Sequence, residues 1–160
     1  MKAQRLAELR VRDIRHLLVD EPSWVGPAVS IRAVMEKMIA DLRTRWVYVV
    51  DDEHRLIGAI SMNSIVEYLF PLEAIIEHSF PLYEVYFPKV GALTAHDLID
   101  ASTPRITEET SLADMADLLM QHQVNELPVV NDQGVLIGQV NVYEVIRAYL
   151  GADNDKARED

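Results

Sequence analysis

The residue types that most often carry catalysis or bind metals are few and scattered in this chain. The 160 residues include no cysteine, and the five histidines are dispersed, which leaves no Ser/His/Asp arrangement and no metal-binding spacing of histidines. The acidic run Asp51-Asp52-Glu53 offers oxygen ligands to Mg²⁺, but acidic residues are also common in turns between strands. We therefore expect neither an enzyme nor a metal site.

Two polar pairs stand where helices are predicted to begin. Ser61 and Ser64 are three residues apart, and so are Asn141 and Glu144. The free N–H groups at the start of a helix favour anions, so each pair is a candidate ligand contact. The same spacing fits a capping box, in which the side chains at the N-cap and at N3 each accept a hydrogen bond from a backbone N–H. Both roles stay open for each pair.

The two polar pairs occupy the same place in a repeated unit. Residues 45–70 align without gaps on residues 125–150, at a constant offset of 80. Each copy runs from an apolar stretch through an acidic turn to two apolar residues and a glycine, then to a second apolar stretch and an amphipathic helix. The identical pairs are Val49/Val129, Val50/Val130, Asp52/Asp132, Leu56/Leu136, Ile57/Ile137 and Gly58/Gly138. Such a duplication usually builds a body of pseudo-two-fold symmetry.

Apolar spacing predicts the same order of elements in both copies. In the first copy it predicts a helix over residues 31–42 after the cap Ser30, a β-hairpin of residues 46–50 and 56–60, and a helix over residues 62–70. The expected elements of the second copy are a strand at 104–106, a helix from Leu112, a hairpin of 127–130 and 135–140, and a helix at 142–150. Each unit is therefore strand–helix–strand–strand–helix.

The repeats set the expected organisation of the chain. Arg12-Asp13-Ile14 and His96-Asp97-Leu98 are similar lead-ins to the two copies. The aromatic, proline-punctuated insert either closes one end of the core or forms a partner surface. The predicted parts are a helical lead-in at 1–10, a first repeat at 11–70, the insert at 71–95, a second repeat at 96–150 and a disordered tail at 151–160.

Composition excludes several classes of protein. The formal net charge of −11 and the isoelectric point near 4.8 argue against a nucleic-acid-binding surface, which needs clustered basic residues. No apolar run approaches the length of a membrane span, and the charged amphipathic N-terminus lacks the apolar core of a signal peptide. We therefore expect no membrane insertion and a cytoplasmic location.

The apolar–acidic–glycine pattern of the repeats is similar to that of a known family. The second copy carries Leu127-Pro128-Val129-Val130, Asp132, Gly134 and Leu136-Ile137-Gly138, and the first carries Val47-Tyr48-Val49-Val50, Asp52 and Leu56-Ile57-Gly58. On these residues the chain resembles a tandem pair of CBS (cystathionine β-synthase) domains, also called a Bateman module. The first copy departs from the family pattern at Tyr48, where proline is usual, and at His54, where glycine is usual.

The resemblance implies a fold, a ligand class and a role. It implies an α+β (α/β) fold of two strand–helix–strand–strand–helix repeats packed as a pseudo-two-fold pair. Many such pairs bind AMP, ADP, ATP or S-adenosylmethionine in clefts, and two pairs commonly dimerise. Their usual role is to regulate enzymes, channels and transporters, and they are not usually catalysts.

The resemblance also implies the residues that would contact the ligand. In the family, a Thr/Ser-x-x-Asp step places a hydroxyl near phosphate and a carboxylate on the ribose hydroxyls. Here Ser64 stands in the Asp position of the first copy, whereas Glu144 and Asn141 replace the Asp and the Thr/Ser of the second. The matching strands supply the other positions. The candidate ligand-binding residues are Trp24, Val25, Tyr48, Ser61, Ser64, Arg105, Ile106, Pro128, Asn141 and Glu144.

These expectations combine into one hypothesis and one alternative. The leading hypothesis is a stand-alone regulatory CBS pair, without a required cofactor, that forms a homodimer, binds a nucleotide and modulates an effector enzyme or transporter. The acidic net charge favours AMP or an adenosyl ligand over ATP. The alternative is a ligand-free interaction or scaffold protein that acts through its dimer face and the aromatic insert at 71–95.

Overall fold

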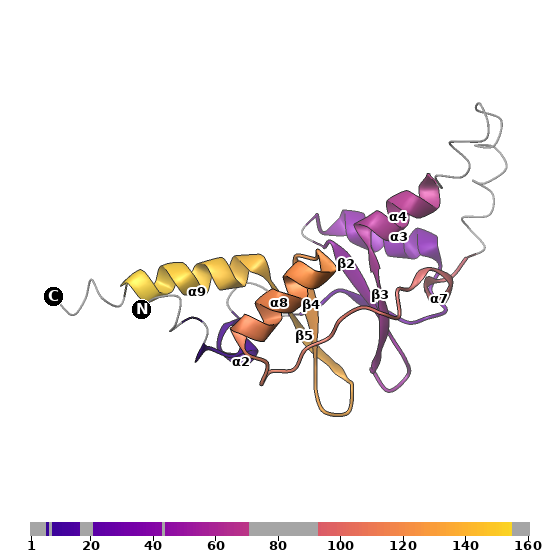
Figure 1. The fold of residues 1–160 in the computed structure, drawn as a ribbon. Helices are drawn as coiled ribbons and strands as arrows, with labels where there is room; N and C mark the ends of the chain where they lie inside the picture. The colour runs from indigo at the N-terminus through magenta and orange to yellow at the C-terminus, as the bar shows by residue number, and fades with distance from the viewer. Residues whose placement is uncertain (1–5, 7, 17–20, 43, 71–92, 155–160) are drawn as a thin grey trace. The chain divides into compact units, whose positions relative to one another are not determined.

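The structure divides the chain into two compact units, each of which contains parts of both repeats. It is a computed structural model, and Figure 1 shows its fold. The central unit is Ser23–Thr103, and the terminal unit combines Met1–Pro22 with Pro104–Asp160. The described residues are 6, 8–16, 21–42, 44–70 and 93–154. Most of the predicted insert, at 71–92, and the end of the predicted tail, at 155–160, lie outside them.

The central unit is a three-stranded sheet with two helices of the first repeat and a short helix from the lead-in to the second. Its elements are β1 (Trp24–Val25), α3 (Ile31–Ala40), β2 (Trp46–Val50), β3 (Leu56–Ser61), α4 (Met62–Leu69) and α7 (Ala95–Leu98). The strand order is β1-β2-β3, with β1 parallel to β2 and β2 antiparallel to β3. Ser30 caps α3 through a hydrogen bond from the backbone N–H of Ala33, as its position predicts.

The terminal unit repeats the helix–hairpin–helix order. Its elements are α2 (Val11–Ile14), α8 (Leu112–His122), β4 (Glu126–Val130), β5 (Leu136–Asn141) and α9 (Val142–Asn154). The predicted strand at 104–106 is reduced to one parallel bridge between Ile106 and Val129. The helix α9 runs four residues beyond its predicted end and takes in the first part of the predicted tail. These elements confirm the predicted α+β fold.

Alternation along the strands separates a core face from an outer face in the central sheet. Val25, Val49 and Ile60 lie in one apolar cluster with Ile31 and Ala95. Since successive side chains of a strand point to opposite faces, the residues between them point away from that core. Trp24, Tyr48 and Ala59 are directly paired across the three strands, so they share this outer face.

Each unit is completed by a lead-in that precedes the other repeat in the sequence. In the central unit, α7 docks through hydrogen bonds from Ile31 N to Leu93 O (3.0 Å) and from Ala95 N to Val29 O (2.7 Å). In the terminal unit, α2 docks in the same way, and Figure 1 shows it beside α8 and α9. The similar lead-ins recognised in the sequence are therefore exchanged between the repeats.

Two glycines allow these lead-ins to approach the sheets. A Cβ atom on Gly58 would lie 2.8 Å from the carbonyl oxygen of Asp100, the residue that forms an antiparallel bridge with Ala59. A Cβ atom on Gly138 would lie 2.9 Å from Nη1 of Arg15. The glycine that ends the apolar-apolar-Gly step thus has a packing role in both units.

Candidate functional site

The serine pair of the central unit lies at the start of α4. Ser61 is the N-cap, and its Oγ accepts a hydrogen bond from the backbone N–H of Ser64 at 3.0 Å. The two side-chain hydroxyls also lie 2.9 Å apart, within hydrogen-bonding distance. The capping role open to this pair is confirmed, and both hydroxyls are only partly buried.

The polar pair of the terminal unit forms both halves of a capping box. Oδ1 of Asn141 accepts from the backbone N–H of Tyr143 at 2.9 Å and from that of Glu144 at 3.3 Å. In return, Oε2 of Glu144 accepts from the backbone N–H of Asn141 at 2.8 Å. The Glu144 residue is 0% exposed. Its carboxylate therefore serves the start of α9, and a ligand hydroxyl would have to reach a buried side chain to bind it.

The strand residues predicted around the ligand divide between the two faces of the central sheet. Trp24 is 46% exposed on the outer face, and its neighbour Tyr48 on the same face is 0% exposed. The side chain of Val25 points the other way and belongs to the apolar core. Of these two aromatic candidates for ligand contact, only Trp24 has an exposed side chain.

The corresponding residues of the terminal unit show a similar division. The backbone of Ile106 donates to the carbonyl of Pro128 at 3.1 Å, which places the two predicted positions side by side. The side chain of Ile106 lies in the apolar core, whereas Arg105 is exposed and Pro128 is buried. Of Arg105, Ile106 and Pro128, only Arg105 offers an exposed, charged side chain to a ligand.

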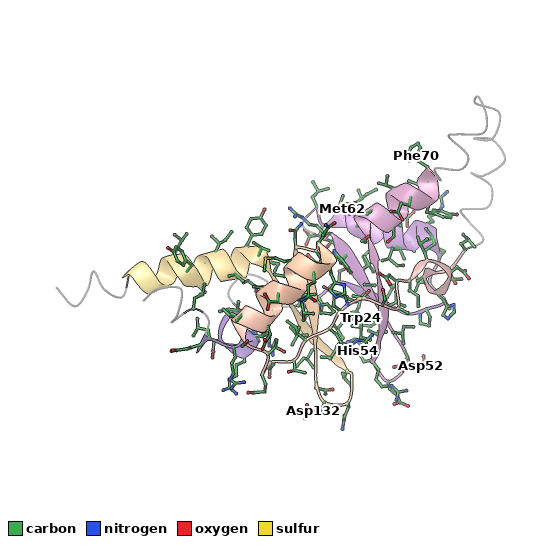
Figure 2. All side chains as sticks on the ribbon, in the orientation of Figure 1. Trp24, Asp52, His54, Met62, Phe70 and Asp132 are labelled. Carbon is green, nitrogen blue, oxygen red and sulfur yellow. The ribbon has the colours of Figure 1, made fainter. Side chains whose placement is uncertain are left out.

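The first hairpin adds His54 to the residues expected at the site. Its ring centroid lies 4.7 Å from that of Trp24, with the two planes perpendicular, and Figure 2 labels the two side chains. His54 has a φ of 61°, and its counterpart Gly134 has a φ of 79°. The departure from glycine at His54 was visible in the sequence, but the ring contact depends on the fold and was not predicted.

The acidic run of the same hairpin is organised as a turn. Oδ1 of Asp51 accepts from the backbone N–H groups of Glu53 (3.0 Å) and Arg55 (2.9 Å), and Oδ2 accepts from the Arg55 side chain at 2.8 Å. Hydrogen bonding, first from the Arg55 backbone, lowers the pKa of Asp51. Asn131 accepts the same two backbone bonds in the other hairpin, so the turn does not require a charge.

Two further classes of site are absent from the part of the chain that the structure describes. Its residues include no group of three His, Cys, Asp or Glu side chains that could hold a metal ion. Among the same residues, no helix has both the length and the apolar character needed to cross a bilayer.

Comparison with known proteins identifies the repeated unit. The sequence model of the CBS domain matches residues 11–71 and 101–151, more than half of the chain. Homoserine O-acetyltransferase of Methanocorpusculum labreanum is 34% identical over 65 residues, which cover 41% of this chain but 13% of that enzyme. The chloroplastic CBS domain-containing protein CBSX2 of Arabidopsis thaliana is 26% identical over 138 residues, which cover 79% of this chain and 58% of that protein. The matches thus span little more than half of CBSX2 and a small part of the transferase.

Solved structures share the fold. CBSX2 in complex with AMP is 24% identical, with a TM-score of 0.69 over 91% of this chain and 98% of that chain. The CBS domain pair of protein MJ0100, in complex with 5′-methylthioadenosine and S-adenosyl-L-methionine, is 17% identical. Its TM-score is 0.64 over 89% of this chain and 97% of that chain.

Proposed function

Because this chain belongs to the CBS domain family and carries the domain as a tandem pair, we propose that it is a regulatory module for an adenosine-type ligand. It binds an AMP-like or S-adenosylmethionine-like compound and passes the change to a partner protein, without catalysis of its own. The observation that carries this proposal is the match of both repeats to the domain. The complexes of CBSX2 with AMP and of MJ0100 with adenosyl compounds support the ligand class.

The central unit has the more accessible set of candidate ligand groups. Trp24 offers an exposed ring on the outer face of the sheet, and Ser61 and Ser64 offer partly buried hydroxyls at the start of α4. In the terminal unit the carboxylate of Glu144 is buried in the capping box. The formal net charge of −11 disfavours additional phosphates, so AMP or an adenosyl compound is preferred to ATP.

Regulation requires that the ligand distinguish between conformations of the chain. A ligand that binds one conformation more tightly shifts the population toward it by its differential affinity. The effector protein, an enzyme or a transporter, then responds to that conformation. No cofactor is required for this role.

A panel of ligands tests the proposal by thermal unfolding. The full chain is heated with AMP, ADP, ATP or S-adenosylmethionine, and with ribose 5-phosphate as a control that lacks the base. A ligand at 100 times its Kd adds about 2.7 kcal/mol to the free energy of unfolding. For a chain of this size the expected rise in Tm is roughly 5–10 °C. A flat panel at millimolar ligand contradicts the proposal.

Exposed apolar residues on α4 support a homodimer as the form in which the module works. Met62, Val66 and Phe70 follow one another at intervals of four residues and are each about half exposed. Residues four apart share one side of a helix, so they form one apolar stripe at the surface. Figure 2 shows Met62 and Phe70 at the two ends of α4.

Sedimentation of charged variants tests this assembly. Val66→Glu places a charge in the middle of the stripe and should convert a dimer into monomers. Glu67→Lys is the matched control, because Glu67 is an exposed polar residue of the same helix outside the stripe. A wild-type chain that sediments as a monomer, or a dimer unaffected by Val66→Glu, contradicts a dimer formed through α4.

The alternative function is a ligand-free interaction or scaffold protein. The exposed apolar side chains of α4, together with Tyr143, Ile146 and Leu150 of α9, favour it because such surfaces often mark contacts with other proteins. The aromatic residues of the insert, which the same hypothesis uses, lie outside the described residues. A scaffold predicts a flat ligand panel together with loss of assembly when Val66 is replaced by Glu.

A further inference from the structure

Trp24 has two aromatic neighbours in the central unit, Tyr48 and His54, and we call the three residues the aromatic corner. Trp24 lies directly opposite Tyr48 in the pairing of β1 with β2, and its ring contacts that of His54 at a centroid distance of 4.7 Å. Trp24 and Tyr48 share the outer face of the sheet, and His54 reaches Trp24 from the turn between β2 and β3. Figure 2 shows Trp24 and His54 together at this place.

The terminal unit builds an equivalent hairpin but has none of these aromatic rings. Ile106 bridges Val129 in parallel, as Val25 pairs with Val49, which makes Arg105 the counterpart of Trp24. The counterparts of Tyr48 and His54 are Pro128 and Gly134. Since both units build the same hairpin, the fold does not require the aromatic corner.

His54 is held in a backbone conformation that suits glycine. Its φ of 61° lies in the left-handed region, where a Cβ atom is disfavoured, and Gly134 adopts a φ of 79° at the equivalent place. Histidine thus stands where glycine would adopt this φ without strain. Gln123 adopts a similar φ of 54° without a ring contact, so the conformation alone assigns no role. At His54 the conformation coincides with the contact to the Trp24 ring, and the two observations together point to a role for the imidazole.

The geometry leaves part of the Trp24 ring available. A perpendicular contact between two rings occupies at most one face of either ring. The contact with His54 therefore leaves at least one face of the indole uncovered by the imidazole, and Trp24 is 46% exposed. Tyr48, its neighbour on β2, is 0% exposed, so Trp24 is the accessible one of the two rings.

The charges around the corner select one end of a nucleotide. The hairpin carries the three acids Asp51, Asp52 and Glu53 against one cation, Arg55, which pairs with Asp51 at 2.8 Å and with Glu53 at 3.1 Å. The net negative charge that remains disfavours a phosphate at this place. A planar, uncharged heteroaromatic ring stacks on an indole without that penalty. The base is therefore the part of an adenosine-type ligand that fits the corner.

We propose that Trp24 is the stacking platform for the base and that His54 is a positioning residue that holds the indole for it. This inference rests on the proposed function and assigns the base end of the site to the central unit. It also makes the two units unequal, because the terminal unit has no aromatic ring at any of the three positions.

Calorimetric titration of AMP into the full chain tests the assignment. Trp24→Ala should weaken binding about fivefold or more, as the loss of one stacking ring does. His54→Gly should weaken it about two- to tenfold while the Tm is unchanged or higher, because glycine suits the turn. His54→Phe, which restores a ring without an imidazole, should recover most of the affinity.

A control variant separates the ring from the backbone. Gln123 has a φ of 54° at the end of α8, so Gln123→Gly relieves a left-handed residue in the terminal unit without touching the corner. Its affinity for AMP should equal that of the wild type. The chain has two tryptophans, so in a Trp46→Phe background the emission reports Trp24 alone. That emission should change on adding AMP, and His54→Gly should alter it without ligand.

The outcomes distinguish this inference from the proposed function. Selective weakening by Trp24→Ala and His54→Gly supports it. Equal affinity of these variants and the wild type for AMP overturns the inference and leaves the proposed function intact. The same weakening in Gln123→Gly also overturns it, since a general change in the chain would then be the cause. If the wild-type chain binds S-adenosylmethionine but not AMP, the same variants are titrated with that compound, and no binding of either compound overturns both the inference and the proposed function.

Discussion

Alanine at the two repeated glycines should affect the two units unequally. Gly58 and Gly138 occupy equivalent positions, and neither has a left-handed φ, so alanine strains neither backbone by itself. The difference lies in what the new methyl group meets. At Gly58 it meets the backbone of Asp100, with the carbonyl oxygen at 2.8 Å and the carbonyl carbon at 3.2 Å. At Gly138 it meets the side chain of Arg15, with Nη1 at 2.9 Å.

The clash at Gly58 should lower the stability considerably, because the opposing backbone is fixed. Asp100 and Ala59 exchange two backbone hydrogen bonds, of 2.9 and 3.3 Å, which hold the lead-in of α7 against β3. Each is worth about 0.5–1.5 kcal/mol. Overpacking of a tight contact destabilises the folded state by about 1–3 kcal/mol more. Alanine also reduces the conformational entropy of the unfolded chain, which stabilises the protein by about 0.4–1 kcal/mol. We expect Gly58→Ala to destabilise the protein by about 2–4 kcal/mol.

The clash at Gly138 should lower the stability only slightly, because the Arg15 side chain can turn away. Arg15 is held by a 2.6 Å ion pair with Glu108 and a longer 3.3 Å bond to the carbonyl of Ile137. Only the longer bond needs to be given up, so Gly138→Ala should stay within about 1 kcal/mol of the wild type. Urea unfolding followed by circular dichroism measures both variants. Equal losses of stability would refute the account of the close approach at Gly58.

Three other substitutions test the local structure. Gln123→Gly should stabilise the chain by about 1 kcal/mol in urea, because glycine suits the left-handed end of α8. Ser61→Ala should cost about 0.5–2 kcal/mol by removing the cap of α4, and no loss would contradict that role. Asp51→Asn should keep the turn, since Asn131 forms it in the other hairpin. Hydrogen bonds, first from the Arg55 backbone, lower the pKa of Asp51 below its ordinary 3.8. The carboxyl therefore adds stability above that value and loses it as the pH falls through the folded pKa, so Asp51→Asn should flatten the acid limb of a stability–pH profile.

Much of the fold could be predicted because its signals are local. The hairpin of β2 and β3 follows from two apolar runs around an acidic turn, and α3 follows from apolar spacing behind Ser30. The prediction of a strand at 104–106 was wrong, because this segment pairs with β4 only through a single bridge at Ile106. Extension of α9 to Asn154 was not predicted, because the polar end of the helix has no apolar periodicity to reveal it.

The features that were missed depend on residues far apart in the sequence. The exchange of lead-ins brings Arg15 against Gly138, and nothing in the local pattern of either segment indicates that contact. The contact between Trp24 and His54 likewise joins a strand to a turn thirty residues away. The sequence also did not show which strand residues point into the core. That depends on the strand register, which places Val25 in the core and Trp24 on the outer face.

Calorimetric titration of the wild-type chain with AMP and with S-adenosylmethionine tests the central claim most directly. The account predicts saturable binding of at least one of them, and no binding of ribose 5-phosphate, which lacks the base. Absence of binding by both adenosine compounds, with the chain folded and at millimolar ligand, would contradict a module for an adenosine-type ligand.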